Sequence, residues 1–285
     1  MKFVSRLLFA LVVIISSYSV SASALKIDAS EHANPWTQLN IRDDPNRFQF
    51  AVVADRTGGA RPGVFEKAVD KLNLLQPQFV LCVGDLIQGY TEDINQINFE
   101  WDQFDAIVQK LNMPFFYLPG NHDISNPSMA SVWQSRFGRT YYHFLYRNTL
   151  FLFLNTEDPS FHHISSRQID YFRKVLSDNQ NVRWIIIFMH EPMWQGNPTI
   201  EWINFESLLN NRPCTFFAGH HHTYTKTVIE GRDYYTLATT GGAVKDPNDR
   251  CTFDHIAWVT MTDAGPQLSN LLLDGILTDQ PCPQH

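Results

Sequence analysis

The hydrophobic and polar positions of the chain alternate between short apolar runs and longer amphipathic stretches. Residues 64–75 carry apolar side chains three and four positions apart, which predicts a helix, between apolar runs at 48–54 and 79–83 that predict strands. The same patterns predict further helices at 99–111, 167–176 and 200–209, and strands at 114–118, 141–146, 150–154, 184–189 and 215–218. Only strand patterns follow, at 224–230, 234–239, 255–262 and 268–273. This order predicts a mixed, layered α/β fold with two sheets between helices.

The N-terminus has the features of an export signal. A positively charged start precedes an apolar run over 7–15, and Ala22-Ser23-Ala24 fits a cleavage site after Ala24. The apolar run is too short to span a bilayer, which takes roughly 18 to 20 apolar residues, and no later stretch is long enough. We therefore expect a signal peptide over 1–24 and a single secreted or periplasmic domain over 25–285, without a membrane span. A retained N-terminal anchor is the alternative.

The charge of the chain limits its partners. The 285 residues carry a formal charge of −7, and cleavage removes Lys2 and Arg6, which leaves −9. A protein of this charge does not neutralise many phosphates at once, so no nucleic-acid partner is expected. A small phosphoester remains compatible, because bound metal ions outweigh the overall charge locally. No feature of the sequence indicates a protein partner.

The four cysteines fall into two pairs by their surroundings. Cys82 and Cys214 lie inside apolar runs, where a cysteine acts as a small buried hydrophobic residue. Cys251 and Cys282 lie in polar segments, and in an oxidising compartment we expect a disulfide between them. No two cysteines have C-x-x-C spacing, so no thiolate metal site is expected.

Polar residues with metal-binding side chains follow successive predicted strands. Ligands of layered α/β proteins tend to bind outside the carboxyl ends of the strands. Each of these motifs alone fits a turn, but their recurrence at strand ends predicts one shared site. The motifs are Asp55, Gly84-Asp85, Gly120-Asn121-His122-Asp123, His190 and Gly219-His220-His221-His222.

The residue types of these motifs indicate the chemistry. Carboxylate, amide and imidazole groups without cysteine suit Mn, Fe, Zn or Mg. Two such ions roughly 3.5 to 4 Å apart clamp the attacking and leaving oxygens of phosphoryl transfer and lower the pKa of bound water. Such a centre needs a bridging carboxylate, and an acid near the leaving group assists it.

In this order and spacing, the G-D, G-N-H-D and G-H-x-H motifs resemble those of the calcineurin-like metallophosphoesterase superfamily over residues 48–222. The resemblance implies a four-layer α/β/β/α sandwich with two mixed sheets and the metal site at the carboxyl ends of the strands. It also implies two divalent metal ions and a phosphatase or phosphodiesterase activity on a small phosphoester.

The resemblance implies a role for each motif residue. Asp85 bridges the two ions, Asn121, His190 and His220 complete one metal site, and Asp55 and His222 serve the other. His122 binds no metal but faces the phosphoryl group, where it stabilises or protonates the leaving oxygen. Asp123 holds the imidazole of His122 in position.

The first motif departs from the superfamily pattern, because Asp55-Arg56-Thr57 stands where Asp-x-His is usual. Three alternatives remain open. Thr57 or a water fills the missing position and the first metal binds weakly, a distant residue such as Glu157 or Asp158 substitutes, or the site holds one metal and hydrolyses poorly. The last alternative keeps a second function open, that of a non-catalytic metal- or phosphate-binding protein with the same fold.

Three side chains outside the motifs have two interpretations each. Arg56 and Arg61, in the loop after the first strand, either pair with substrate phosphate or lie in a solvated loop. Trp194 either stacks on the leaving group or packs in the core. His162 and His163 are expected to be exposed loop residues.

Overall fold

The computed structural model describes residues 25–28, 30, 33–39, 48–244, 246, 249–273 and 275–277. The predicted signal peptide, 1–24, lies outside these residues, so secretion or periplasmic export stays a prediction. Among the residues described, no helix is long and apolar enough to cross a membrane.

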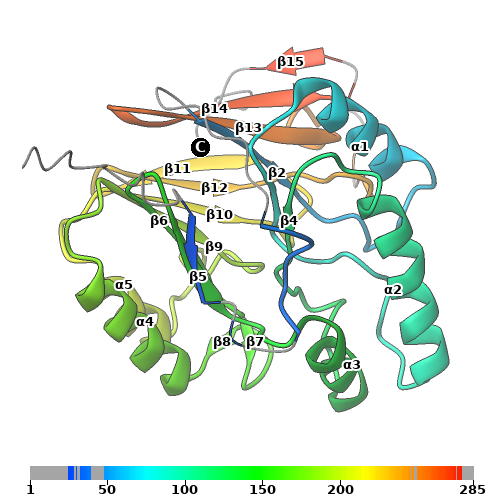
Figure 1. Ribbon diagram of the computed structural model, residues 1–285, viewed down its shortest axis with the longest axis horizontal. Helices are drawn as coiled ribbons and strands as arrows, with labels where there is room; N and C mark the ends of the chain where they lie inside the picture. Colours follow the sequence, from blue (N-terminus) through cyan, green and yellow to red (C-terminus); the bar gives the residue numbers. More distant parts are fainter. Residues whose placement is uncertain are drawn as a thin grey trace, which may run out of the picture.

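Two large mixed sheets form the centre of the molecule (Figure 1). The first has seven strands in the order β1-β5-β6-β9-β10-β12-β11, and the second has six in the order β15-β14-β13-β2-β3-β4. The strands of the first sheet are β1 (Leu25–Ile27), β5 (Tyr142–Tyr146), β6 (Thr149–Phe153), β9 (Trp184–Phe188), β10 (Cys214–Ala218), β11 (Thr225–Ile229) and β12 (Arg232–Thr236). Those of the second are β2 (Phe48–Val53), β3 (Val80–Cys82), β4 (Phe115–Phe116), β13 (His255–Thr262), β14 (Gly265–Leu272) and β15 (Gly275–Leu277). A small separate sheet pairs β7 (Glu157–Asp158) with β8 (His163–Ile164).

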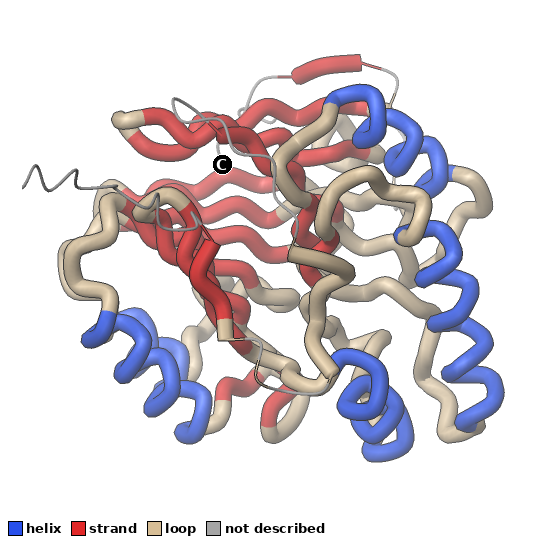
Figure 2. Tube along the Cα trace, viewed as in Figure 1, coloured by secondary structure: helices blue, strands red, loops and turns tan. Residues whose placement is uncertain are grey.

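Helices cover the outer faces of the two sheets (Figures 1 and 2). Helices α1 (Val64–Leu75), α2 (Ile94–Val108) and α3 (Pro127–Phe137) lie on the side of the six-stranded sheet. Helices α4 (Ser166–Asp178) and α5 (Ile200–Ser207) lie on the side of the seven-stranded sheet. The predicted α/β fold with two mixed sheets between helices is confirmed.

The alternation of side chains along β9 shows how the layers form. Ile186 and Phe188 belong to the core between the two sheets, whereas Ile185 and Ile187 belong to a second core beneath α4 and α5. Successive residues of a strand point to opposite faces, so a strand that is apolar throughout is buried on both. The continuous apolar pattern of 184–189 is therefore the signature of a central strand.

Phe79, just before β3, packs between the sheets. It is fully buried, and its ring lies 5.7 Å from that of Phe50 in the six-stranded sheet. It also meets Phe144 and Phe151 of the seven-stranded sheet edge-on, at centroid separations of 5.7 and 5.5 Å. Phe79 thus joins rings from both sheets, stacked on Phe50 and edge-on to the other two, and aromatic side chains favour both arrangements.

Helix α3 has no counterpart among the predicted elements. Asn126 accepts a hydrogen bond from the Met129 N–H and caps the helix, and Pro127 occupies its first turn. Its buried side chains, Met129, Val132, Trp133 and Phe137, have helical spacing, which was the available signal. Helix α2 begins at Ile94 rather than at residue 99, because Asp93 caps it.

The cysteines divide as expected where the structure describes them. Cys82 and Cys214 are buried free thiols, and Cys251 is disulfide-bonded. The predicted partner of Cys251, Cys282, lies outside the described residues.

Replacing Phe79 by alanine should lower the free energy of unfolding by about 3 to 5 kcal/mol, because the variant leaves a cavity that two sheets share. Phe99→Ala is the matched control, since Phe99 on α2 is 61 % exposed and should cost about 0.5 kcal/mol or less. Guanidinium unfolding of both variants measures the difference. Equal losses would contradict the role given to Phe79.

Candidate metal centre

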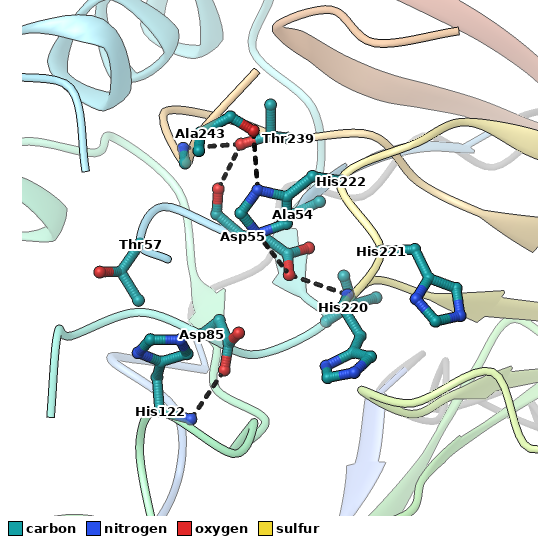
Figure 3. Close-up of polar contacts among 12 residues, drawn as sticks. Ala54, Asp55, Thr57, Asp85, His122, His220, His221, His222, Thr239 and Ala243 are labelled. Carbon is teal, nitrogen blue, oxygen red and sulfur yellow. Dashed lines mark hydrogen bonds and ion pairs between the residues drawn. The ribbon is translucent and has the colours of Figure 1, made fainter. Parts of the chain in front are cut away.

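The predicted site residues converge where parallel strands of both sheets end. In the six-stranded sheet β2, β3 and β4 run parallel, and Asp55, Asp85 and Asn121 follow their carboxyl ends. In the seven-stranded sheet β9 and β10 run parallel, and they are followed by His190 and by the loop of His220 and His222. The two sheets therefore present their loops to one centre (Figure 3).

Two groups of side chains in this centre have the geometry to hold an ion. The ligand atoms of Asp85, His190 and His220 all lie within 4.8 Å of one another, as do those of Asp55, Asp85 and His222. Asp85 belongs to both groups, as a bridging carboxylate must. Asn121 joins the first group, since its Oδ1 lies 2.8 Å from Nε2 of His190 and 2.9 Å from Nδ1 of His220.

Two of the imidazole rings, those of His190 and His222, have the tautomer that metal binding needs. Nδ1 of His190 lies 2.7 Å from the Val83 carbonyl oxygen, and Nδ1 of His222 lies 2.8 Å from that of Ala243. A carbonyl only accepts hydrogen bonds, so each Nδ1 donates and carries the proton. In the neutral ring, Nε2 then carries a lone pair that is directed at the centre. This is the arrangement found in metal-bound histidines.

The buried charge of the centre calls for a cation. Asp55 and Asp85 are almost fully buried, and Oδ2 of Asp55 has no hydrogen-bond partner among the described residues. Burial raises the pKa of Asp85, but the charge and hydrogen bond of His190 in its protonated form outweigh it and lower this pKa to about 2, and a bound metal ion would take the place of that Nε2 proton. Ionised carboxylates without full hydrogen bonding are costly inside a protein unless a metal binds them. The donor set therefore fits two divalent ions.

Backbone geometry explains the glycines of the motifs. A Cβ on Gly120 would collide with the Asp85 carboxylate, and one on Gly219 would collide with the Asp55 carboxylate. The ligands themselves carry strain, because Asp85, His220 and His222 have φ angles of 59°, 71° and 54°. Such left-handed conformations of non-glycine residues cluster at functional sites.

His122 lies beside the centre but outside both ligand groups. Its backbone N–H donates to Oδ1 of Asp85 at 2.9 Å. Its Nδ1 lies 2.7 Å from the Gln88 carbonyl oxygen, which leaves Nε2 as the free edge of the ring. A Cβ built on Gly58 would lie 3.6 Å from this Nε2 and 3.1 Å from Nε2 of His222, so both rings face the Gly58 loop.

Asp123 does not hold the imidazole of His122, and this prediction is wrong. Its two oxygens accept hydrogen bonds of 2.8 to 3.1 Å from the N–H groups of residues 85–87 and 120. A carboxylate that accepts several backbone N–H groups fixes the loops that carry them. Asp123 therefore positions the two loops that present Asp85 and Asn121, whereas the Gln88 carbonyl orients the His122 ring.

Thr57 is buried near the Asp55 group, but its hydroxyl is directed elsewhere. Its Oγ1 donates to Oε1 of Gln88 at 2.8 Å, and Figure 3 shows the hydroxyl pointing away from the Asp55 carboxylate. Neither distant acid fills the gap. Oδ2 of Asp158 accepts from Ser165 and Gln168, and Glu157 belongs to neither ligand group of the described residues. The Asp55 group thus has one protein ligand fewer than the Asp85–Asn121–His190–His220 group.

The remaining side chains of interest have structural partners. Arg56 donates to the Leu86 carbonyl oxygen, and Arg61 pairs with Asp254, so contacts within the protein hold both side chains. Trp194 is buried against Tyr234, which confirms the packing interpretation.

The sequence did not predict the residues that contact the ligands, or their neighbours, from outside the centre. The amide of Asn121 donates to the Tyr90 hydroxyl at 2.5 Å, which turns Oδ1 of Asn121 toward the histidines. His162, expected to be exposed, contacts the buried carboxylate of Glu191. Only the proximity of Tyr90 to Asp85 and of Glu191 to His190 in the sequence hinted at these roles.

We expect the two metal positions to differ in affinity because of Thr57. Thr57→His should tighten binding of the second equivalent of Zn, since an imidazole nitrogen replaces a water or a misdirected hydroxyl. Thr57→Val is the control and should leave that equivalent unchanged. Calorimetric titration of metal-free protein measures both sites. Two equal, tight sites in the wild type, or weaker binding in Thr57→Val, would show that the Asp55 group is already complete.

The sequence model of the calcineurin-like phosphoesterase family matches residues 48–224 of the chain, and no curated protein matches. Among solved structures, a dimetal phosphatase from Danio rerio aligns with a TM-score of 0.63 at 18 % identity, covering 82 % of this chain and 99 % of its own. Purple acid phosphatase from yellow lupin (Lupinus luteus) seeds aligns with a TM-score of 0.64 at 17 % identity, covering 83 % and 53 %. The anchor in the inner membrane complex of Plasmodium aligns with a TM-score of 0.61 at 14 % identity, covering 80 % of this chain and 85 % of its own.

These structural similarities lie at low sequence identity and establish the fold alone. The family match is independent of them, and it spans all the strands and loops that build the centre, from β2 to the histidine loop after β10. On this match, the chain belongs to the calcineurin-like phosphoesterase family.

Proposed function

We propose that the protein is a metal-dependent hydrolase of a small phosphomonoester or phosphodiester. The observation that carries this proposal is the pair of carboxylate and imidazole groups that share Asp85. Asp85, Asn121, His190 and His220 would hold one ion, and Asp55, Asp85 and His222 the other. When bound, the two ions supply positive charge to the phosphoryl oxygens and lower the pKa of water. Mn, Fe, Zn and Mg all accept these donors, with a harder ion favoured in the Asp55 group.

The protein's own groups complete the reaction around this charge. The His122 ring donates from Nδ1 to the Gln88 carbonyl oxygen, so Nε2 is the free edge of the ring, and in the doubly protonated ring the Nε2 proton can pass to the leaving oxygen and leave the neutral imidazole. Asp123 fixes the loops of Asp85 and Asn121, and the Tyr90 hydroxyl fixes the Asn121 amide. These contacts hold the ligands before substrate binds, which reduces reorganisation during the reaction.

A second candidate function is that of a metal- or phosphate-binding protein without turnover. The observation that favours it is Thr57, whose hydroxyl bonds to Gln88 instead of entering the Asp55 group. Hydrolysis of p-nitrophenyl phosphate and its diester analogue, after reconstitution with each metal in turn, separates the two functions.

Replacing His122 by asparagine should lower kcat by about 10²- to 10⁴-fold, the usual range for a lost acid–base group. Metal content should not change, because His122 lies outside both ligand groups. His221→Asn is the matched control, since this neighbouring histidine is exposed and points away from Asp55 and Asp85 (Figure 3). Elemental analysis and steady-state kinetics measure the two effects. Loss of bound metal in His122→Asn, or equal losses of kcat in both variants, would refute the role of His122.

A further inference from the structure

A large cleft opens at the metal centre. Its volume is about 1390 Å³, and Asn121 and Tyr90 line it on the side of the centre. It continues between the start of α3 and the segment that contains β7 and β8. Small-molecule sites usually measure about 300 to 1,000 Å³. The cleft therefore has room for a leaving group much larger than the phosphoryl group itself.

Tyr90 exposes an aromatic ring at this cleft. The side chain is 58 % exposed, and its ring centroid lies 4.6 Å from that of His122 in an edge-on arrangement. Tyr90 has a φ of 53°, an unfavourable conformation for a residue with a side chain. Its hydroxyl accepts the hydrogen bond from Asn121, which holds the ring in place. The ring is therefore exposed and anchored, on a strained backbone beside His122, and this combination indicates a contact surface.

Phe161 exposes a second ring at the same cleft. It is 55 % exposed, and its centroid lies 5.8 Å from that of His220. The next residue, His162, has a φ of 59° and contacts the buried carboxylate of Glu191. This contact ties the Phe161 segment to the residue that follows His190. Phe161 is thus held against the metal centre although most of its ring gains nothing from burial.

We propose that Tyr90 and Phe161 bind a planar ring in the leaving group of the substrate, either a nucleobase or a simple aryl group. This inference rests on the proposed phosphoester hydrolysis and names its substrate class. The two rings line one cleft, and each lies against a different histidine of the centre. The cleft is also lined by the uncharged polar residues Ser125 and Asn155, next to the charged residues Glu157, Asp158 and Arg167. The uncharged pair suits ring heteroatoms or sugar hydroxyls.

Stacking on exposed aromatic side chains is an effective way to recognise such a group. It accepts any nucleobase, because every base presents a π face. An aliphatic leaving group would leave both rings exposed to water. The structure therefore favours phosphoesters of ring-bearing alcohols over those of short aliphatic alcohols.

The test compares benzyl phosphate, adenosine 5′-monophosphate and ethyl phosphate in Mn²⁺-loaded protein. Phe161→Leu and Tyr90→Leu should lower kcat/KM for benzyl phosphate by about 5- to 150-fold more than for ethyl phosphate, mainly through KM. Tyr90→Phe keeps the ring and should retain the preference for benzyl phosphate. Phe99→Leu, at a side chain of similar exposure outside the cleft, should match the wild type on every substrate. A loss on adenosine monophosphate as well as benzyl phosphate identifies a nucleobase site, and a loss on benzyl phosphate alone identifies an aryl site.

Binding of non-hydrolysable phosphonates separates this inference from the proposed function. Calorimetry should show that benzylphosphonate binds the wild type more tightly than ethylphosphonate does, and that Phe161→Leu removes the difference. If the wild type hydrolyses no ester but keeps this difference, the proposed function fails and the ring site stands. If both phosphonates bind equally, or both variants weaken them equally, the ring site is overturned whatever the activity.

Discussion

The burial of two carboxylates between the ends of two sheets is the constraint on which the rest of the centre depends. Asp55 and Asp85 lie almost fully buried, each at the end of a strand of the six-stranded sheet. Their charge must be compensated, because an unpaired charge in the interior costs several kcal/mol. The histidines that face these carboxylates, and that would hold the compensating metal ions with them, follow strands of the other sheet. The electrostatics of the centre therefore links two layers that aromatic packing holds together elsewhere.

The same constraint accounts for the unusual backbone of the loops. Ligands from different strands must approach one another closely, so the residues beside them are glycines and several ligands adopt positive φ angles. Asp123 compensates for this strain, because its carboxylate accepts hydrogen bonds from backbone N–H groups of both loops. The loops are thereby held in a conformation that an isolated turn would not maintain.

Much of the fold and of the ligand set could be predicted from the sequence, because periodicity is a local signal. Apolar runs such as 184–189 report burial on both faces, and the ligands follow these runs directly. The role of Asp123 could not be predicted, since it depends on which of several nearby donors its oxygens meet in three dimensions. Helix α3 was missed although Asn126 and Pro127 marked its start. No periodic pattern in the sequence predicted the exposed rings of Tyr90 and Phe161.

The proposed centre depends above all on one carboxylate, Asp85, that two metal ions would share. Electron paramagnetic resonance of protein loaded with increasing Mn²⁺ tests it most directly, because ions that share a ligand at roughly 3.5 to 4 Å couple magnetically. We expect a coupled two-ion spectrum at two equivalents of Mn²⁺, and the loss of this coupling in Asp85→Asn. Two uncoupled ions, or saturation at a single equivalent, would show that Asp85 is not shared by two ions.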